Sequence, residues 1–144
     1  MQKTLILLKP EAIDRGLVGS ILARFENASL RIENCRSCRP SLRHLEEHYA
    51  DLKTRNEAAF RRTTRFLQDK PFIAAVIAGG NAIEKARALV GPTDPGAAAP
   101  GTIRGDFSSD TILSADAENR ATCNLVHAAD SEAAVVRETA LWFA

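Results

Sequence analysis

The C-terminal stretch "NLVHAADSEAAVVRETALWFA", residues 124–144, combines a short apolar run, a histidine and an amphipathic segment. The apolar run that ends before His127 predicts a strand, and Asp130 or Ser131 can cap a helix that starts directly after it. If that helix forms, one stripe holds four side chains at offsets of 4, 7 and 11 residues, namely Ser131, Val135, Glu138 and Trp142. The sequence therefore predicts a strand and helix unit that turns Glu138 toward the interior.

Glu138 is the unusual member of this stripe, because a carboxylate on the core side of a helix is costly unless a hydrogen bond satisfies it. The stripe passes behind the end of the strand, so Glu138 can accept a hydrogen bond from one ring nitrogen of His127 and leave the other lone pair facing outward. That arrangement orients an activated nucleophile or base. Spacing alone equally allows a surface histidine and a carboxylate at the edge of the core.

The rest of the chain alternates between predicted strands and helices. Strands are expected at residues 4–9, 30–38, 71–80 and 122–126, and helices at 17–28, 42–53, 56–68, 81–91 and after Ser131. Residues 91–107, rich in Gly and Pro, and the polar residues 108–121 are expected to form an irregular, ordered or functional loop. The order predicts an α+β sandwich in the split βαβ arrangement, with helices packed on an antiparallel sheet.

The composition predicts one soluble globular domain, residues 1–144, with 45% hydrophobic and 26% charged residues. A net charge of +1 gives no general attraction to nucleic acid or to an anionic membrane. The apolar run near residue 5 is too short for a signal sequence or a membrane span. Three cysteines, an odd number, favour a reducing cytoplasm over a disulfide framework.

The motif "CRSC", Cys35 to Cys38, raises the possibility of a metal or redox site. A zinc site needs further ligands, and Cys123 alone does not supply a second pair. The surrounding sequence predicts a strand, in which residues three apart face opposite sides and cannot share a metal. The structural interpretation of these cysteines is therefore favoured. His44 and His48, on a polar helical stretch, are likewise interpreted as surface or packing residues.

Six blocks follow one another along nearly the whole chain: "LLKPEAIDRGLVGSILARFE", "HYADLK", "GPTDP", "PGTIRGDF", "NLVHAADS" and "LWF". Together they resemble the nucleoside diphosphate kinase family, in its bacterial type with a longer loop before the catalytic histidine. The resemblance implies a ferredoxin-like βαββαβ sandwich with a four-stranded antiparallel sheet. It also implies ping-pong transfer of the γ-phosphate of ATP or another nucleoside triphosphate to a nucleoside diphosphate through a phosphohistidine, which maintains NTP and dNTP pools.

The resemblance also assigns roles to particular residues. His127 would be the phosphorylated nucleophile, Glu138 its hydrogen-bonding carboxylate, and Tyr49 a neighbour of the transferred phosphate. Lys9 would reach the ribose hydroxyl and terminal phosphate, and Asn124 the ribose 3′-hydroxyl. The nucleotide's phosphates would be held by Arg87, Thr93 and Arg104. Forked guanidinium donors match phosphate geometry, and phosphoryl transfer depends mainly on positioning and charge stabilisation.

Further expectations concern the cofactor and partners. Mg²⁺ would be bound mainly through the nucleotide phosphates, and no residue is assigned as a metal ligand. The protein would bind nucleoside di- and triphosphates and no membrane or specific nucleic acid. It would form a homo-oligomer, with a tetramer or hexamer favoured over a dimer. The base would stack on a residue of "TRNEAAFRR", where Ala59 or Phe60 falls at the stacking position and Phe60 is the candidate.

The chain departs from the family's pattern at several positions. Ala128 and Ala129 follow the histidine where most members have Gly and Ser, so a hydroxyl near Glu138 is missing. The stretch around residues 107–121 is longer than in most relatives. Ala129 and the uncertain stacking residue leave one alternative, a nucleotide-binding regulator of the same fold with weak or no turnover. A second alternative is an RNA-binding module, because the same βαββαβ order also serves RNA recognition. Such a module needs stacking aromatics on its sheet, and the chain has only 6% aromatic residues.

Overall fold

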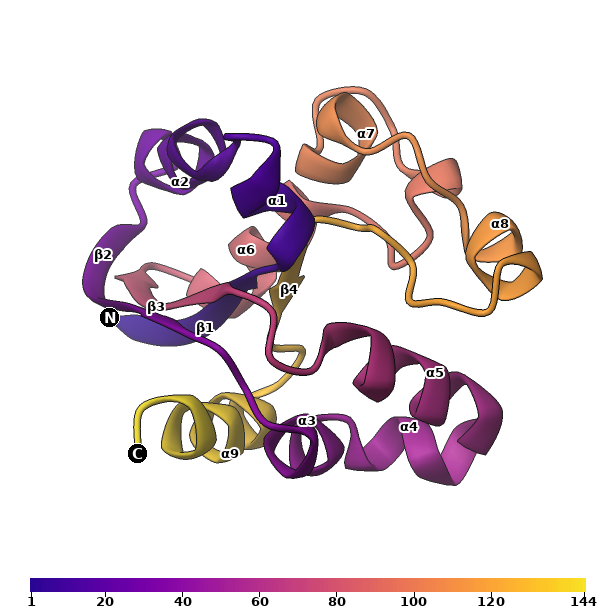
Figure 1. The fold of residues 1–144 in the computed structure, drawn as a ribbon. Coiled ribbons are helices and arrows are strands. Elements are labelled where there is room, and N and C mark those ends of the chain that lie inside the picture. The colour runs from indigo at the N-terminus through magenta and orange to yellow at the C-terminus, as the bar shows by residue number, and fades with distance from the viewer.

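The computed structural model describes all residues 1–144, and its four strands pair into one sheet in the order β2, β3, β1, β4 (Figure 1). The strands are β1 (Gln2–Leu8), β2 (Arg31–Cys38), β3 (Phe72–Gly79) and β4 (Val126–Ala128). Each neighbouring pair is antiparallel. The predicted α+β class, a ferredoxin-like sandwich with a four-stranded antiparallel sheet, is confirmed.

Helices cover both faces of this sheet (Figure 1). The helical segments are α1 (Pro10–Asp14), α2 (Val18–Asn27), α3 (Leu42–His48), α4 (Ala50–Arg55), α5 (Glu57–Leu67), α6 (Ala82–Val90), the 3₁₀ turn η1 (Pro95–Ala97), α7 (Ile103–Phe107), α8 (Ile112–Ala117) and α9 (Glu132–Trp142). Helices α2 and α6 pack on one face, and α3, α5 and α9 on the other. None of these helices is long and apolar enough to cross a membrane.

The central strand β1 supplies both halves of the hydrophobic core. Ile6 and Leu8 belong to the cluster under α2 and α6, whereas Leu5 and Leu7 belong to the cluster under α3, α5 and α9. This alternation follows from the two-residue period of a strand, which points successive side chains to opposite faces. Because both faces are covered, β1 is apolar on both sides, and the chain that follows it at Lys9 leaves from the middle of the sheet.

The expectation that residues 91–121 are irregular throughout is wrong. Side chains cap three short helical segments there: Asp94 accepts a hydrogen bond from the N–H of Gly96, and Thr102 and Thr111 accept one from residues three further on. These caps satisfy backbone donors at the start of each segment. The Gly- and Pro-rich composition therefore indicated a loop where local capping produces η1, α7 and α8.

Two predicted boundaries are also corrected. The helix expected over residues 42–53 is interrupted at Tyr49, which ends α3 and begins α4 with φ −94° and ψ 19°. The last strand starts at Val126 rather than at residue 122. Leu125 has φ +71°, a left-handed conformation that a strand cannot continue through. His127 consequently lies inside β4 rather than after it.

The cysteine pair of "CRSC" has the structural character that the sequence favoured. Cys35 is exposed on β2, and Cys38 packs against the core cluster under α3, α5 and α9. Both are free thiols. Burial raises the pKa of the Cys38 thiol, which disfavours the reactive thiolate.

Candidate active site

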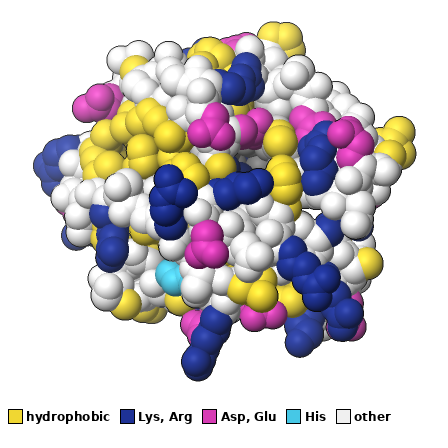
Figure 2. Space-filling view, in the orientation of Figure 1, with side chains coloured by type: hydrophobic (Ala, Val, Ile, Leu, Met, Phe, Trp, Pro, Cys, Tyr) yellow, Lys and Arg dark blue, Asp and Glu magenta, His cyan; other side chains and the backbone are white.

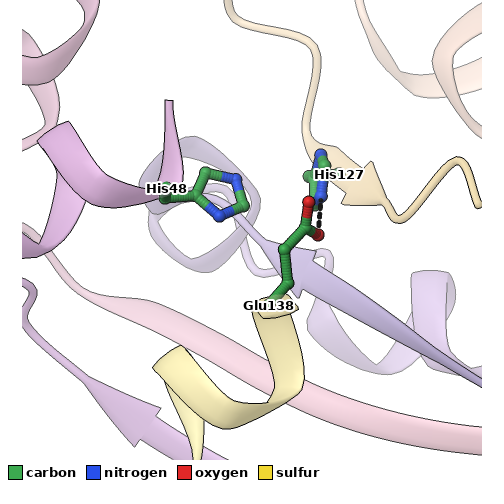
Figure 3. Close-up of side chains that lie close together, drawn as sticks. All are labelled: His48, His127 and Glu138. Carbon is green, nitrogen blue, oxygen red and sulfur yellow. Dashed lines mark hydrogen bonds and ion pairs between the residues drawn. The ribbon is translucent and has the colours of Figure 1, made fainter. Parts of the chain in front are cut away.

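His127 lies in the middle of β4, opposite Leu7 of β1, and its Nε2 atom is 2.6 Å from Oε1 of Glu138 (Figure 3). Glu138 comes from α9, which begins where the Ser131 hydroxyl accepts a hydrogen bond from the backbone N–H of Ala134. The side chain of Glu138 is 5% exposed and that of His127 is 24% exposed. The predicted strand and helix unit therefore forms, and it contains the predicted hydrogen bond between the two side chains.

Burial keeps the His127 imidazole neutral. Together with nearby positive charges, burial lowers its pKa to about 3. These charges are those of Lys9, Arg104 and Arg87. Burial raises the pKa of Glu138, and the guanidinium of Arg137, with Nη2 3.4 Å from Oε2 of Glu138, opposes that rise. A carboxylate only accepts hydrogen bonds, so the imidazole proton sits on Nε2 and the lone pair of Nδ1 is free.

Lys9, Asn124 and Thr93, which the sequence placed far apart, are joined by hydrogen bonds. Lys9 Nζ donates to Asn124 Oδ1 at 2.8 Å, and Asn124 Nδ2 donates to the backbone oxygen of Thr93 at 3.1 Å. Asn124 is buried, whereas Thr93 is exposed. Burial and the charge of Arg104 lower the pKa of Lys9 to about 8. The Lys9 ammonium is therefore held in a polar network in which it loses its proton at mildly alkaline pH.

Arg104 is almost fully enclosed, with 4% of its surface exposed. Its guanidinium donates to the backbone oxygens of Asn124, Gly91, Pro92 and Val126, at 3.0, 2.9, 2.9 and 2.6 Å. A guanidinium has five N–H donors, so one Nη2–H is left. Arg104 thus joins the chain before β4 to the loop after α6, a structural role that the sequence did not predict. Its positive charge remains near His127.

Arg87 is the most accessible of the cationic side chains around His127. It lies on α6, and its Nη1 donates to the backbone oxygen of Ala128 at 3.2 Å. Its other guanidinium donors make no hydrogen bond within the chain. Ala128 directly follows His127, and the charge of Arg87 is one of those that lower the pKa of His127. Arg87 is therefore available to an anion that approaches His127.

Tyr49 and His48, at the break between α3 and α4, form an aromatic wall next to His127. The His48 ring is 4.7 Å from the ring of Tyr49 and 4.7 Å from that of His127, nearly perpendicular to both. Burial and the charge of Glu138 raise the pKa of Tyr49, so its phenol stays protonated. His48 was assigned only a surface or packing role from the sequence. Its spacing of three residues from buried Leu45 was the signal that it faces inward.

The predicted base-stacking residue is poorly placed for that role. Phe60 lies on α5 with 4% of its surface exposed, and Lys53 Nζ stands 5.7 Å from the centre of its ring. Ala59 is 9% exposed and has no aromatic face. Neither residue presents an accessible ring to a base in this conformation.

Ion pairs hold the longer stretch around residues 107–121 in place, one between its two ends and one from its middle to α5. Arg120 pairs with Asp110 through two contacts of 2.6 and 3.0 Å, which closes the stretch on itself. Arg62 of α5 pairs with Asp116 of α8, which ties the stretch to the helical hairpin α4–α5. Several ion pairs, one of them formed through two contacts, hold a segment more firmly than a single exposed pair does. The stretch is thus folded against the α5 side of the molecule.

One group of side chains has metal-ligand spacing: a ligand atom from each of His48, His127 and Glu138 lies within 4.8 Å of the others. Two imidazoles and one carboxylate do not suit Mg²⁺, which prefers oxygen ligands and keeps several waters. This group is therefore not a set of ligands that would hold Mg²⁺.

Figure 2 shows Lys and Arg side chains across the middle of one face and over the α4–α5 hairpin, with Asp and Glu side chains among them. The mixture agrees with the net charge of +1. Proteins that hold nucleic acid by its backbone need a broad basic surface. The charges on this face instead suit a small anion that contacts a few cations locally.

Comparison with known proteins finds chains of similar sequence. Residues 2–144 match the family model described as nucleoside diphosphate kinase. A nucleoside diphosphate kinase of Caldanaerobacter subterraneus is 39% identical over 143 residues, covering 99% of this chain and 94% of its own. One from Streptococcus uberis is 38% identical over 142 residues, with coverage of 99% and 94%.

Solved structures show the same similarity. The nucleoside diphosphate kinase of Borrelia burgdorferi, solved as a transition-state mimic with bound vanadate and ADP, superposes with a TM-score of 0.95 and 34% identity. That match covers 99% of this chain and 87% of the other. The enzyme of Halobacterium salinarum, solved in complex with CDP, gives a TM-score of 0.83 and 33% identity, with coverage of 99% and 87%.

Proposed function

The chain belongs to the nucleoside diphosphate kinase family, and on that premise we propose that it passes the γ-phosphate of a nucleoside triphosphate to a nucleoside diphosphate through a phosphohistidine at Nδ1 of His127. The observation that carries the proposal is the 2.6 Å contact between Nε2 of His127 and Oε1 of Glu138, because it leaves Nδ1 as the free nucleophile. The protein thereby works as a phosphotransferase that binds its two nucleotides in turn.

The first half-reaction needs no general base. The Nδ1 lone pair of neutral His127 attacks the γ-phosphorus, and the new N–P bond forms as the bond to the bridging β,γ-oxygen breaks. The nucleoside diphosphate leaves with that electron pair. The positive charge that develops on the imidazole faces Glu138 through the Nε2–H, so the buried carboxylate stabilises the transition state. In the second half-reaction a terminal oxygen of the acceptor diphosphate attacks the same phosphorus and frees His127.

The cationic residues have separate tasks in this scheme. Arg87, with free guanidinium donors, contacts the phosphates directly. Arg104 acts through its charge and its one remaining donor while it holds the loop in place. Lys9 and Asn124 contact the sugar hydroxyls, and Lys9 also contacts the terminal phosphate. The exposed hydroxyl of Thr93 contacts the phosphates. The protonated Tyr49 phenol donates a hydrogen bond beside the transferred group. Phe60 has no part in the proposal, because its ring is covered.

Mg²⁺ on the nucleotide phosphates supplies further charge neutralisation during the transfer. We further propose that the protein is cytoplasmic and forms a homo-oligomer, with a tetramer or hexamer favoured over a dimer, as the family resemblance implies. Strand β2 supports association because it is an edge strand with largely exposed side chains. An unpaired edge of this kind is a common contact surface between chains.

A labelling experiment tests the proposed function. Purified protein is mixed with Mg²⁺ and γ-labelled ATP, the nucleotide is removed, and acid-labile label is measured on the chain and after addition of GDP. We expect label on His127 that moves into GTP. Protein that binds ATP but takes no label would instead support a nucleotide-binding regulator.

The pH dependence of the reaction should reflect Lys9. Its pKa of about 8 means that the charged form dominates below that pH and is lost above it. We therefore expect kcat/KM to fall about tenfold per pH unit above this point, since kcat/KM reports the free enzyme. Arg104 and Cys123 have higher pKa values, about 10 and about 11. A decline that begins near pH 8 would therefore report Lys9 rather than either of these groups. A Lys9→Arg variant, charged throughout, should lose this alkaline decline, and a decline that persists at the same pH would contradict the assignment.

Ala129→Ser restores the hydroxyl that most relatives carry. Ala129 is fully buried in the cluster under α3, α5 and α9, and its N–H donates to Leu5 O at 3.1 Å. A hydroxyl that bonds Glu138 would raise kcat by about tenfold or less, and one that does not would leave kcat unchanged, since a neutral hydrogen bond contributes about 1 kcal/mol. Steady-state kinetics at saturating nucleotide measure this effect. A large loss of kcat in folded protein would show that the position has another role.

A further inference from the structure

His48 is held by a hydrogen bond whose direction cannot be reversed. Trp142 Nε1 donates to His48 Nδ1 at 3.0 Å, and the two residues are 2% and 5% exposed. An indole nitrogen only donates hydrogen bonds, so Nδ1 of His48 must carry a lone pair and Nε2 must carry the proton. The tautomer of His48 is therefore set by the chemical identity of Trp142.

The other side of the same ring contacts the proposed nucleophile. The rings of His48 and His127 lie 4.7 Å apart at 83°. Figure 3 shows His48 beside the hydrogen-bonded pair of His127 and Glu138. A ring packed perpendicularly against an imidazole restricts its rotation. A half-turn of the His127 ring would put Cδ2 in the place of Nδ1 and Cε1 in the place of Nε2. Trp142, His48 and His127 thus form a continuous chain of contacts from the core to the reacting atom.

The fixed tautomer also removes one alternative for His48. Its Nδ1 lone pair is used by Trp142, so His48 cannot serve as a second nucleophile. Burial and the nearby His127 hold the pKa of His48 well below the usual range, so its ring stays neutral. What remains is a neutral ring with a defined orientation.

We propose that Trp142 and His48 form a positioning pair that holds the His127 ring with Nε2 on Glu138 and Nδ1 toward the phosphates. The pair touches neither substrate, and it acts through His127. This inference rests on the proposed phosphohistidine. It assigns a function to two buried residues that would otherwise only fill the core.

Trp142→Phe tests the pair, because it keeps an aromatic ring and removes the N–H donor. Two measurements are made on folded protein: the single-turnover rate of His127 labelling by γ-labelled ATP, and the tautomers of His48 and His127 from ring ¹⁵N shifts. We expect labelling to slow about tenfold, the equivalent of one lost hydrogen bond, with ADP affinity unchanged within twofold. We also expect His48 to become a mixture of tautomers. An unchanged His48 tautomer or labelling rate would overturn the proposal.

Phe72→Leu is the matched control for lost packing. The Phe72 ring lies 5.3 Å from Trp142 in the same core cluster and makes no contact of this kind with His48. It should lower the melting temperature and leave the labelling rate and both tautomers unchanged. Equal slowing in Phe72→Leu and Trp142→Phe would mean that packing alone matters, and the pair would have no separate role.

A second variant covers the case in which Trp142→Phe does not fold. His48→Gln keeps an acceptor for Trp142 and removes the ring that packs on His127. Labelling should slow about tenfold with ADP affinity retained, and labelling at the wild-type rate would overturn the proposal. Wild-type protein that takes no label would refute the proposed function itself. Labelled wild type with equally fast variants would refute only the positioning pair.

Discussion

His127→Ala is expected to abolish phosphoryl transfer while the protein stays folded and still binds ADP. The substitution removes Nδ1, the atom that forms the bond to phosphorus in the proposed reaction. Loss of a covalent nucleophile commonly lowers kcat by roughly 10⁴-fold or more. The measurement is the turnover of GDP with ATP, together with acid-labile label on the chain.

The fold should survive this change because the contacts that His127 loses are local. The backbone pairing of β4 with β1 does not depend on the side chain. Glu138 loses its imidazole partner, but Arg137 lies 3.4 Å away, and burial already raises the pKa of this carboxyl toward its neutral form. We expect a loss of roughly 1–3 kcal/mol in the free energy of unfolding, the usual cost of an unsatisfied buried group. Circular dichroism and ADP titration are the controls. Substantial turnover or label in pure, folded His127→Ala protein would refute the assignment of the nucleophile.

The predictions that succeeded are those that depend on local periodicity. The helical spacing of Ser131, Glu138 and Trp142, and the start of the helix at Ser131, fixed the position of the carboxylate behind the strand. The continuous apolar run of β1 and the patterns of the segments after it were sufficient for the order of strands and helices. Such patterns persist in the structure because burial selects one face of each element.

The features that the sequence did not predict depend on contacts between distant segments, or on helix caps that the overall composition of a segment does not indicate. The sequence did not predict that four donors of Arg104 bind backbone oxygens, because these oxygens are close to one another only in the folded chain. Leu125 adopts φ +71°, which no apolar residue signals in a sequence. Thr102 and Thr111 start helices in a stretch that composition marked as a loop. Each of these helices begins where one side-chain oxygen accepts a hydrogen bond from a backbone N–H of the first turn. The overall composition of the stretch gives no indication of such a contact.

His48 shows a different limit of sequence reasoning. Its helical stretch is polar, so the sequence indicated a surface or packing residue, and the spacing from Leu45 was compatible with a position on the inner side. Its hydrogen bond with Trp142 joins residues that are 94 positions apart in the chain. Only the folded structure shows that α9 supplies Glu138 to His127 and Trp142 to His48, two imidazoles that pack against each other.

Glu138→Gln is the second change for which we expect a large effect. Glutamine keeps the size of the side chain and an oxygen that accepts the hydrogen bond from His127 Nε2, so the ring should keep its orientation. What disappears is the negative charge that stabilises the imidazole as it becomes positive during attack. Hydrogen bonds to charged groups contribute about 1.5–3 kcal/mol, so we expect the single-turnover rate of labelling to fall about one hundredfold. Stability should rise or stay constant, because a buried charge is removed.

Glu132→Gln provides the matched control, since Glu132 lies on the first turn of the same helix and is exposed. It removes the same charge without touching His127, and it should leave the labelling rate unchanged while slightly weakening the helix start. The combination of a slower reaction and an equal or higher melting temperature in Glu138→Gln separates charge stabilisation from a structural defect. If Glu138→Gln labels as fast as wild type, the carboxylate serves only to orient the ring, and the positive charge must be stabilised by solvent or by the phosphate itself.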